Sequence, residues 1–530
     1  MRRPFCLMTM IWVSASCAVE TRDPADPVEF EATAGITPAA LPSTVYNLTG
    51  RTSPAAGATG TNIDTRLTVT FDGPPVLGGG TIQIFRQSDD ALVDTLQIGA
   101  ESDVIGFPGQ DRLRRVNVDR LLSVSGNTLR IVPHHAKLAY ATTYYVGIAT
   151  GVVVGAALGG KAFNGIGKAG AWSFTTRAAP AGSLTTLVVD DNGAADFRTV
   201  QGALDHVMKN VARDTPATIN VRNGTYEELL FLRGKNNVRI VGESRAGVVI
   251  QYRNYDGLNP GTGGSQTPGT AGSNGGRAVF LIETADLVTL DTLTLKNTML
   301  RSPTVGSQAE TIYFNNDGGR LIARNASFLS EQDTVLVKGY SWFFNSLIAG
   351  NVDFLWGGNR VALFESCEIR SLGDTTNARS GGFIVQARTV SAADKGFVFL
   401  NSRLTHGPGP GPAAGDVPTG ANAATYLARS PGTSTTNDNV AFINCQMDAH
   451  IIPRGWAYNT AGQPIPNPAT ASAVSGWREF GTRTLGGAAI SLSTRIGGHL
   501  LTAGEVAAGF SNRAQIFAAF GGGAGWNPQP

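Results

Sequence analysis

The chain has 530 residues, of which 15% are charged and 66 are glycine, and its formal net charge is +2. This length exceeds that of one ordinary domain, and the weak net charge excludes the concentrated basic surface that binding to DNA or RNA requires. Thr, Asn, Ser and Val recur in short runs, which favours strands and turns over long amphipathic helices. We therefore expect a mostly β protein with more than one domain and no nucleic-acid partner.

Residues 1–17 have the pattern of an export signal. Met1-Arg2-Arg3 is followed by an apolar stretch from Phe5 to Val13 and by the small residues Ser14-Ala15-Ser16. A charged segment, a short apolar segment and a small-residue cleavage site are the parts of a signal peptide. Cys17 after three small residues also resembles a lipoprotein signal, although Ser14 stands where such signals usually carry Leu. We expect a secreted protein, or an outer-membrane or cell-surface lipoprotein with a lipid anchor at Cys17.

The next two segments differ in pattern. Residues 18–45 are rich in Pro, Ala, Thr, Asp and Glu without periodicity, which is typical of a linker. In residues 46–178, apolar and polar residues alternate in short runs between Gly and Pro clusters, as in Leu67–Phe71 and Thr81–Phe85. This alternation predicts a small β-sandwich. The segment also resembles the bacterial Ig-like modules that accompany secreted enzymes.

Histidines and cysteines indicate neither a metal site nor a disulfide framework. His134 and His135 are adjacent, and neighbours on a strand face opposite ways, so we expect a surface pair without a shared metal and assign them no function. After removal of the signal only Cys367 and Cys445 remain. They occupy equivalent positions of a repeat, so we expect small core residues rather than a disulfide.

Residues 185–530 repeat one short template of apolar residues around a polar step. The polar steps are Asn297, Asn325, Asn345, Ser366, Asn401 and Asn444. Periods in the twenties without helix signals indicate a solenoid of strands. We therefore predict an all-β right-handed parallel β-helix, in which Asn and Gly accept the tight bends. The Gly-rich stretches 257–276 and 407–420 are expected to project as loops that wall a cleft.

Two aspartates share the period of this repeat. Asp333 and Asp353 are 20 residues apart, which is also the interval between Asn325 and Asn345. They are expected at equivalent positions of consecutive coils, with their strands roughly 4.8 Å apart. Ionising both carboxyls at that distance is costly, so one pKa rises and a proton stays on one of them. Such a pair supplies an acid and a nucleophile or base.

Glutamines and apolar residues complete the pattern around the pair. Gln308 precedes Gln332 by 24 residues, about one more coil, which would bring a neutral amide donor to a developing oxyanion. The apolar run Phe354-Leu355-Trp356 follows Asp353. It would partly exclude water and so strengthen electrostatic interactions.

These residues and their neighbours resemble the pectinesterase family, carbohydrate esterases with a parallel β-helix fold. The motifs that carry the resemblance stand in the family's order and are Gln308-Ala309-Glu310, Gln332-Asp333-Thr334, Gly350-Asn351-Val352-Asp353-Phe354-Leu355-Trp356-Gly357 and Tyr426-Leu427-Ala428-Arg429. Asp196–Ala203 and Asn223–Glu228 look like the family's first coils. The similarity covers roughly residues 185–525.

The resemblance implies hydrolysis of the C6 methyl esters of polygalacturonate to pectate and methanol, with no metal or other cofactor. Asp353 would attack the ester carbonyl, and Asp333 would protonate the departing methanol and then activate water to hydrolyse the acyl-enzyme. Gln308 and Gln332 would donate to the oxyanion, while Arg429 would hold Asp353 ionised and oriented. The residues expected to bind the sugar are Phe354, Trp356 and Tyr426.

The sequence departs from the family beside this site. Pro431 follows Arg429 closely where the family keeps a Trp, and Leu336 stands where a Tyr is usual, so the sugar subsites are expected to differ. Two alternatives remain open. One is a repurposed homologue that binds a glycan or cleaves a different ester, and the other is a β-helix pectin lyase or polygalacturonase. The expected partner is pectin, and the solenoid is expected to be monomeric.

Overall fold

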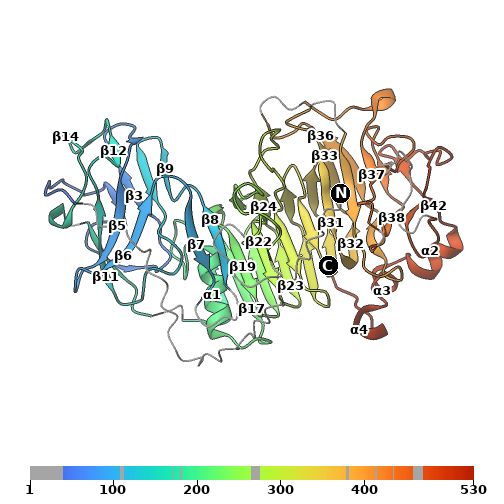
Figure 1. Ribbon diagram of the computed structural model, residues 1–530. Coiled ribbons are helices and arrows are strands. Elements are labelled where there is room, and N and C mark those ends of the chain that lie inside the picture. The colour runs from blue at the N-terminus through green and yellow to red at the C-terminus, as the bar shows by residue number, and fades with distance from the viewer. Residues whose placement is uncertain are drawn as a thin grey trace, which may run out of the picture.

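The computed structural model describes residues 40–107, 113–170, 172–179, 182–263, 275–377, 381–411, 415–433, 435–457 and 470–530. The predicted signal peptide and residues 18–39 of the predicted linker lie outside the described residues. The chain forms a β-sandwich joined to an elongated solenoid of parallel strands (Figure 1). Within the described ranges, no helix has the length and apolar character needed to cross a bilayer.

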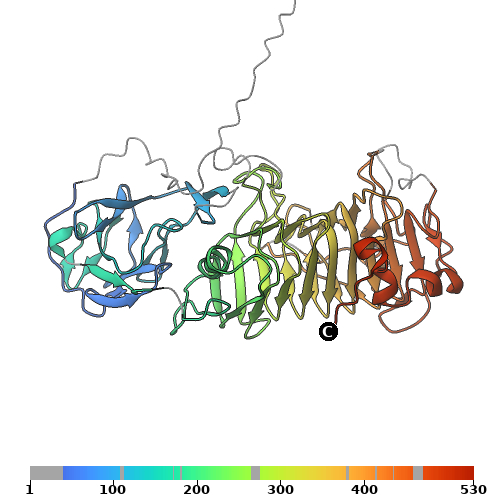
Figure 2. The same cartoon turned by 90° about the horizontal axis from the view of Figure 1, so that it is seen from below.

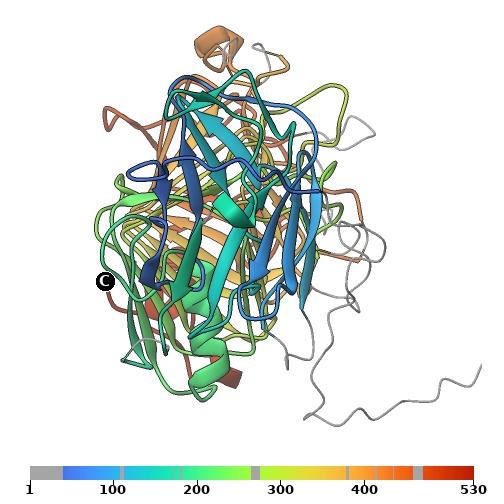
Figure 3. The same ribbon diagram turned by 90° about the vertical axis from the view of Figure 1, so that its left-hand side faces the viewer.

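The first domain is a sandwich of two main sheets, which lies in front in Figure 3. One sheet has the order β1 (Thr52–Ser53), β3 (Leu67–Thr70), β10 (Thr128–Ile131) and β9 (Leu122–Ser125). The other has the order β2 (Ala58–Thr61), β15 (Ser173–Thr176), β11 (Thr143–Ile148), β5 (Thr81–Arg86) and β6 (Leu92–Gln97). The short elements are β4 (Val76–Leu77), β12 (Val153–Val154), β13 (Ala157–Leu158), β14 (Lys161–Ala162) and η1 (Lys168–Gly170). Alternate residues such as Leu67 and Val69 are fully buried, which confirms the sandwich patterning.

A separate antiparallel hairpin of this domain reaches the solenoid. It consists of β7 (Glu101–Ile105) and β8 (Arg114–Val118), paired with Ile105 opposite Arg114. In Figure 1 the hairpin lies between the main sheets of the sandwich and the first coils. The Ig-like domain therefore packs against the solenoid through a dedicated pair of strands.

The second domain consists of three ladders of parallel strands, and each complete coil contributes one strand to each ladder (Figure 2). The first ladder contains β16 (Thr186–Val189), β17 (Ala217–Val221), β20 (Val238–Gly242), β23 (Val288–Asp291), β26 (Arg320–Arg324), β29 (Gly339–Phe344), β32 (Asn359–Glu365), β35 (Gly396–Leu400), β38 (Val440–Ile443), β40 (Trp477–Phe480) and β42 (His499–Leu500). The second contains β18 (Gly224–Glu227), β21 (Val248–Tyr252), β24 (Thr294–Asn297), β27 (Ser327–Leu329), β30 (Leu347–Gly350), β33 (Glu368–Leu372), β36 (Arg403–Gly407), β39 (Gln446–Met447) and β41 (Arg483–Thr484). The third contains β19 (Leu230–Arg233), β22 (Phe280–Glu283), β25 (Ile312–Asn315), β28 (Val335–Val337), β31 (Val352–Gly357), β34 (Phe383–Ala387) and β37 (Tyr426–Ala428). This arrangement confirms the predicted parallel β-helix.

Inward-facing side chains stack from coil to coil and form the core. The rings of Phe343 and Phe364 stack at 4.6 Å, and those of Phe399 and Phe442 at 4.4 Å. Helix α1 (Val200–Asn210) packs its apolar side on the first coils, and Thr199 caps its N-terminus. The remaining helical elements are η2 (Gly420–Asn422), α2 (Ala503–Gly509), α3 (Arg513–Ile516) and α4 (Phe520–Gly523). Helix α1 covers the first coils, which would otherwise expose apolar core to water. The C-terminal helices instead pack on the outer face of the first ladder, where Phe510 and Phe517 join Trp342 in one buried cluster.

The polar step of the repeat is a corner with left-handed backbone. The residues with φ between +47° and +54° at this corner are Asn325, Asn345, Ser366, Asn401 and Asn444. Asn tolerates this conformation better than most residues, and the Asn345 amide donates to Asn325 Oδ1 at 2.8 Å. The assignment of Asn297 to this series is wrong. The strand register aligns Thr292, with φ of +56°, with Asn325.

Cys367 and Cys445 directly follow two of these corners and are free and buried. Burial raises the pKa of each thiol to about 12. The prediction of small core residues is therefore confirmed.

Candidate active site

Asp333 and Asp353 lie on the third ladder, where the chain enters β28 and β31. The backbone N–H of Asp333 donates to the carbonyl of Val352 at 3.0 Å, and Val335 pairs with Leu355. The two aspartates therefore occupy equivalent positions of consecutive coils, as their interval predicts. They are 5% and 6% exposed, so both carboxyls are largely withdrawn from water.

The backbone around this pair is left-handed at both aspartates. Their φ angles are +60° for Asp333 and +48° for Asp353, a conformation that costs a non-glycine residue roughly 1–2 kcal/mol. Glycines allow the surrounding close packing. A Cβ at Gly350 would lie 2.3 Å from Cβ of Phe354, and one at Gly357 would lie 2.2 Å from the carbonyl oxygen of Val337. The motif from Gly350 to Gly357 thus holds Asp353 in a backbone conformation fixed by its neighbours.

Asp353 is held by a guanidinium from two coils further on. Arg429 directly follows β37, and its Nε donates to Oδ1 of Asp353 at 2.7 Å while Nη2 donates to Oδ2. The Gln386 amide also donates to Oδ2, at 3.0 Å. Burial raises the pKa of Asp353 and Arg429 opposes that rise. Three donors on one carboxylate favour its ionised form.

Asp333 shares a second guanidinium with other acids. Arg277 Nη2 donates to Oδ2 of Asp333 at 3.1 Å, and Arg277 Nε donates to the two carboxylate oxygens of Glu310 at 3.1 and 3.0 Å. Its Nη1 donates to Asp256 at 2.9 Å. Glu310 is 1% exposed and, by the register of β25 and β28, lies one coil before Asp333.

The electrostatics of these groups separate the two aspartates. The pKa of Asp333 is raised well above its ordinary value, first by burial and then by Glu310, with Arg277 opposing the rise. Burial also raises the pKa of Glu310, against the effect of Arg277. Arg277 binds Asp256 and Glu310 as well as Asp333, whereas Arg429 binds Asp353. This difference and burial favour the protonated form at Asp333.

The predicted oxyanion donors lie beside the pair. Gln332 is half-buried, pairs with Val352 and accepts the N–H of Ala309 on its carbonyl at 3.3 Å. Gln308, also half-buried, precedes Ala309 on the previous coil. Within the described part of the chain, neither side-chain amide has a hydrogen-bond partner in the protein, so each can donate to a bound group.

The predicted sugar-binding residues occupy three different environments. Phe354 is fully buried in the solenoid core, so the prediction that it contacts substrate is wrong. Trp356 points outward but is only 8% exposed, with the Arg388 guanidinium 4.9 Å from its ring centroid. Tyr426 is half-buried and stacks on Phe383 with a centroid distance of 5.4 Å. An aromatic surface therefore lies next to Arg429, which itself stacks 4.8 Å from Phe383.

A family model described as pectinesterase matches residues 186–466, more than half of the chain. The chain belongs to the pectinesterase family. Members of this family are carboxylic ester hydrolases, which agrees with the predicted enzyme class. A second model, a bacterial Ig-like domain, matches residues 43–176 and confirms the N-terminal resemblance.

Individual pectinesterases show the same relationship. The chain is 28% identical to pectinesterase A of Dickeya dadantii over 300 residues, which cover 52% of this chain and 76% of that protein. It is 28% identical over 297 residues to the probable pectinesterase/pectinesterase inhibitor 64 of Arabidopsis thaliana, with coverage of 52% and 43%. The structure of pectin methylesterase PemA from Erwinia chrysanthemi superposes with a TM-score of 0.50 at 24% identity, covering 66% of this chain and 99% of that one. This last likeness shows a shared fold.

Several residues of the site were not predicted from the sequence. Glu310 belongs to the motif Gln308-Ala309-Glu310. It lies two residues before a strand, as Asp333 does, and this position could have identified it as a site residue. Gln386 and Phe383 lie on β34, whose coil is lengthened by loops, so no interval marks them. Arg277 ends a Gly-rich stretch without periodicity and offered no signal.

Among the described residues, no cluster of three or more His, Cys, Asp or Glu side chains has the arrangement of a metal site.

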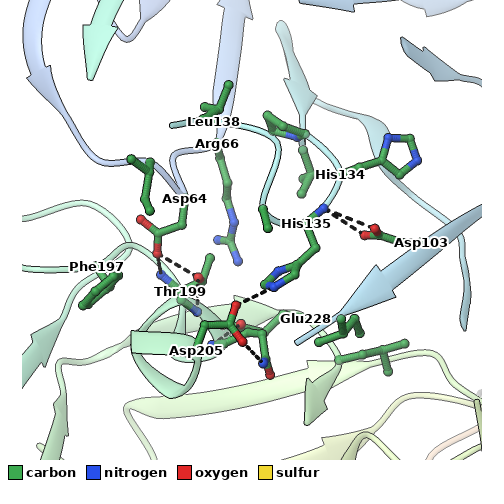
Figure 4. Close-up of a pocket in the computed structure, with 18 of the residues that line it drawn as sticks. Asp64, Arg66, Asp103, His134, His135, Leu138, Phe197, Thr199, Asp205 and Glu228 are labelled. Atoms are coloured by element: carbon green, nitrogen blue, oxygen red, sulfur yellow. Dashed lines mark hydrogen bonds and ion pairs between the residues drawn. The ribbon is translucent and has the colours of Figure 1, made fainter. Parts of the chain in front are cut away.

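A separate cavity of about 570 Å³ lies where the Ig-like domain meets α1 (Figure 4). Asp64 accepts hydrogen bonds from the backbone N–H and the hydroxyl of Thr199, both at 2.8 Å. His135 pairs with Asp205 of α1 at 2.5 Å. Although burial opposes its charge, Asp205 and Asp103 raise the pKa of His135 to about 9. Its polar contacts join the two domains, so His135 is an interdomain residue and the predicted surface pair is wrong.

Proposed function

We propose that this protein hydrolyses the C6 methyl esters of polygalacturonate, producing pectate and methanol through an acyl-enzyme on Asp353. The observation that carries the proposal is the unequal pair of carboxyls on consecutive coils. Asp353 accepts a bidentate guanidinium and an amide, whereas Asp333 shares one guanidinium with two other acids. Such a site contains an ionised nucleophile and a protonated acid side by side.

The first step forms a bond between Asp353 and the ester. An oxygen of the Asp353 carboxylate attacks the carbonyl carbon, and the carbonyl oxygen becomes an oxyanion. The free amides of Gln308 and Gln332 donate to this oxygen, where negative charge develops in the transition state. When the tetrahedral intermediate collapses, the C–O bond to the methoxy group breaks, and Asp333 gives its proton to the leaving oxygen. Methanol departs and leaves an anhydride with Asp353.

The second step returns both carboxyls to their starting states. Asp333, now ionised, takes a proton from a water molecule whose oxygen attacks the galacturonate carbonyl. The bond to Asp353 breaks, Asp353 leaves as a carboxylate bound by Arg429, and the product carries a free carboxylate after losing its remaining proton to solvent. Asp333 again holds a proton. Asp333 is the acid in the first half-reaction and the base in the second. This double role requires its pKa to be raised toward the pH at which the enzyme works.

The groups around the pair suit an acidic sugar polymer. Arg388 is exposed beside Trp356, and Arg454 donates to the Tyr426 hydroxyl at 3.0 Å. The stacked Phe383 and Tyr426 rings offer an apolar face for a sugar ring, and the guanidinium groups offer partners for galacturonate carboxylates. A solved pectin methylesterase with a TM-score of 0.50 to this chain is a complex with a hexasaccharide, which supports a pectin oligosaccharide as the ligand of this site.

Methanol release from highly methylated pectin, with EDTA present, tests the proposal. Asp353→Asn and Asp333→Asn are each expected to lower the rate by about two orders of magnitude or more, the scale of losing a nucleophile or a general acid. Asp317→Asn is the matched control because Asp317 is exposed on a turn of the same domain. A wild-type protein that releases no methanol contradicts the proposal. Activity that needs calcium and yields unsaturated sugars would favour the lyase alternative.

Export and anchoring belong to the same proposal. The pattern of residues 1–17 supports transport out of the cytoplasm, with either cleavage or lipid attachment at Cys17. Polymeric pectin is encountered outside the cell. Cell fractionation and the mass of the mature N-terminus test it, with Cys17→Ala as the variant. A soluble, unmodified product from both chains indicates simple secretion, and retention of the intact N-terminus in the cytoplasm contradicts export.

A further inference from the structure

Strand β8 of the Ig-like domain touches the segment 275–279 of the solenoid. A Cβ at Gly275 would lie 2.1 Å from the carbonyl oxygen of Arg115, so only glycine permits this approach of the two backbones. Asn117, also on β8, accepts a hydrogen bond from the Asn259 amide on its carbonyl at 2.9 Å. The contact therefore combines a close approach of two main chains with side-chain hydrogen bonds, and it lies close to the start of β22.

At this contact, all three nitrogens of the Arg114 guanidinium donate hydrogen bonds to backbone carbonyl oxygens. Nε donates to Gly275 at 2.8 Å, Nη1 donates to Leu230 at 2.7 Å, and Nη2 donates to Gly276 at 3.1 Å and Ala278 at 2.6 Å. The residue is 2% exposed. Among the described residues no carboxylate forms an ion pair with Arg114, and burial lowers its pKa to about 9, although the charge of Glu283 opposes the fall.

Burying a cation that forms no direct ion pair is costly. Elsewhere at the junction, charges are paired, as in Arg130 with Glu227 at 2.7 Å. The planar fork of arginine is suited to binding several acceptors in fixed directions. The contacts of Arg114 therefore indicate that its task is to fix the course of a backbone segment.

The segment that Arg114 fixes carries Arg277. The carbonyls of Gly276 and Ala278 flank Arg277, and each also accepts a hydrogen bond from the buried Asn254 amide, at 3.0 and 2.9 Å. The backbone is thus held on both sides of the residue. From this base, Arg277 reaches Glu310 and Asp333.

We propose that Arg114 of the Ig-like domain is a positioning residue for the esterase site, because it fixes the backbone from which Arg277 binds Glu310 and Asp333. The inference rests on the proposed function. Arg277 is 7% exposed, so it acts through the carboxyls and not on the substrate. If its guanidinium moves away, Asp333 loses a positive neighbour and binds its proton more tightly. Misplacement by about 1 Å can cost about a hundredfold in rate.

The test compares full-length Arg114→Met with Arg115→Met, a matched control with an exposed side chain on the same strand. We expect Arg114→Met to lower kcat by about tenfold or more, to change KM by less than about twofold, and to move the basic limb of the pH–rate profile to higher pH. Arg115→Met should match the wild type. Arg277→Met should show the same shift as Arg114→Met, and the double variant should be no worse than Arg277→Met, because residues acting through one contact are not additive.

Other results overturn the inference. An unchanged pH profile in Arg114→Met, or losses that multiply in the double variant, would show that Arg114 does not act through Arg277. Arg114→Lys, which keeps the charge but loses the fork, replaces Arg114→Met if that variant does not fold. Failure of both to fold would make Arg114 a folding determinant only. If the wild type proves inactive on pectin, the proposed function fails, and the pH dependence of Tm, which responds to the same buried carboxyls, decides the inference.

Discussion

The carboxyl groups of Asp353 and Asp333, in the two halves of the candidate site, have opposite charge surroundings. Around Asp353 one guanidinium serves one carboxylate and a neutral amide adds a third hydrogen bond. Around Asp333 one guanidinium serves three acids, two of them almost fully buried. Burial is similar for both aspartates, so the number of acids per cation is what separates their pKa values. Acid and nucleophile roles thus follow from local charge balance, and changing that balance should change them.

Removing the cation from the Asp353 half is expected to have the largest effect. Arg429→Met leaves Asp353 buried without its ion-pair partner, so its pKa rises further. We expect kcat/KM on pectin to fall by about a hundredfold or more, and the acidic limb of the pH profile to move to higher pH because the nucleophile must be ionised. Arg403→Met, an exposed arginine on β36, is the control. An acidic limb that stays in place would show that Arg429 does not set the ionisation of Asp353.

Removing the charge of Glu310 should shift the basic limb of the pH–rate profile in the opposite direction from removing the charge of Arg277. Glu310 is, after burial, the main cause of the raised pKa of Asp333. Glu310→Gln keeps the shape but removes the charge, so Asp333 should lose its proton at lower pH. The basic limb is expected to move to lower pH, with about a tenfold loss of rate on the alkaline side. A movement to higher pH, as predicted for Arg277→Met, would contradict the charge-balance interpretation.

The raised pKa of Asp333 also predicts a link between pH and stability. Since the folded-state pKa lies above the unfolded value, this group stabilises the fold relatively more below about pH 4 and costs stability as pH rises toward its folded pKa. Asp333→Asn removes that cost. We expect its Tm to exceed the wild-type value by about 1–3 °C at neutral pH and to equal it in acid, as measured by thermal unfolding. Asp317→Asn should show no such difference, and a Tm gain independent of pH would argue against a titrating Asp333.

The sequence predicts those parts of the site that depend on the repeat. Asp333 and Asp353 share one coil interval, so their stacking follows from backbone geometry. Arg429 was found through a motif and not through spacing, because long loops separate its coil from that of Asp353. Arg277 has neither a motif nor an interval, and Arg114 belongs to another domain, so only the folded chain brings them to Asp333. Asn297 was misplaced because Thr292 and not an asparagine occupies the corner of that coil.

The smallest expected effect is a change in KM at one of two phenylalanines near the site. The sequence alone does not show which of the two contacts the substrate. Phe383 is partly exposed and stacks on Tyr426 beside Arg429, whereas Phe354 is fully buried in the core. We expect Phe383→Leu to raise KM for pectin by about threefold to tenfold, the scale of one aromatic contact, while leaving Tm unchanged. Phe354→Leu should lower Tm by repacking the core and leave KM unchanged. Steady-state kinetics and thermal unfolding of both variants decide between them. A raised KM in Phe354→Leu at full stability would restore its predicted contact with the sugar, and an unaltered KM in Phe383→Leu would remove the stacked pair from the cleft.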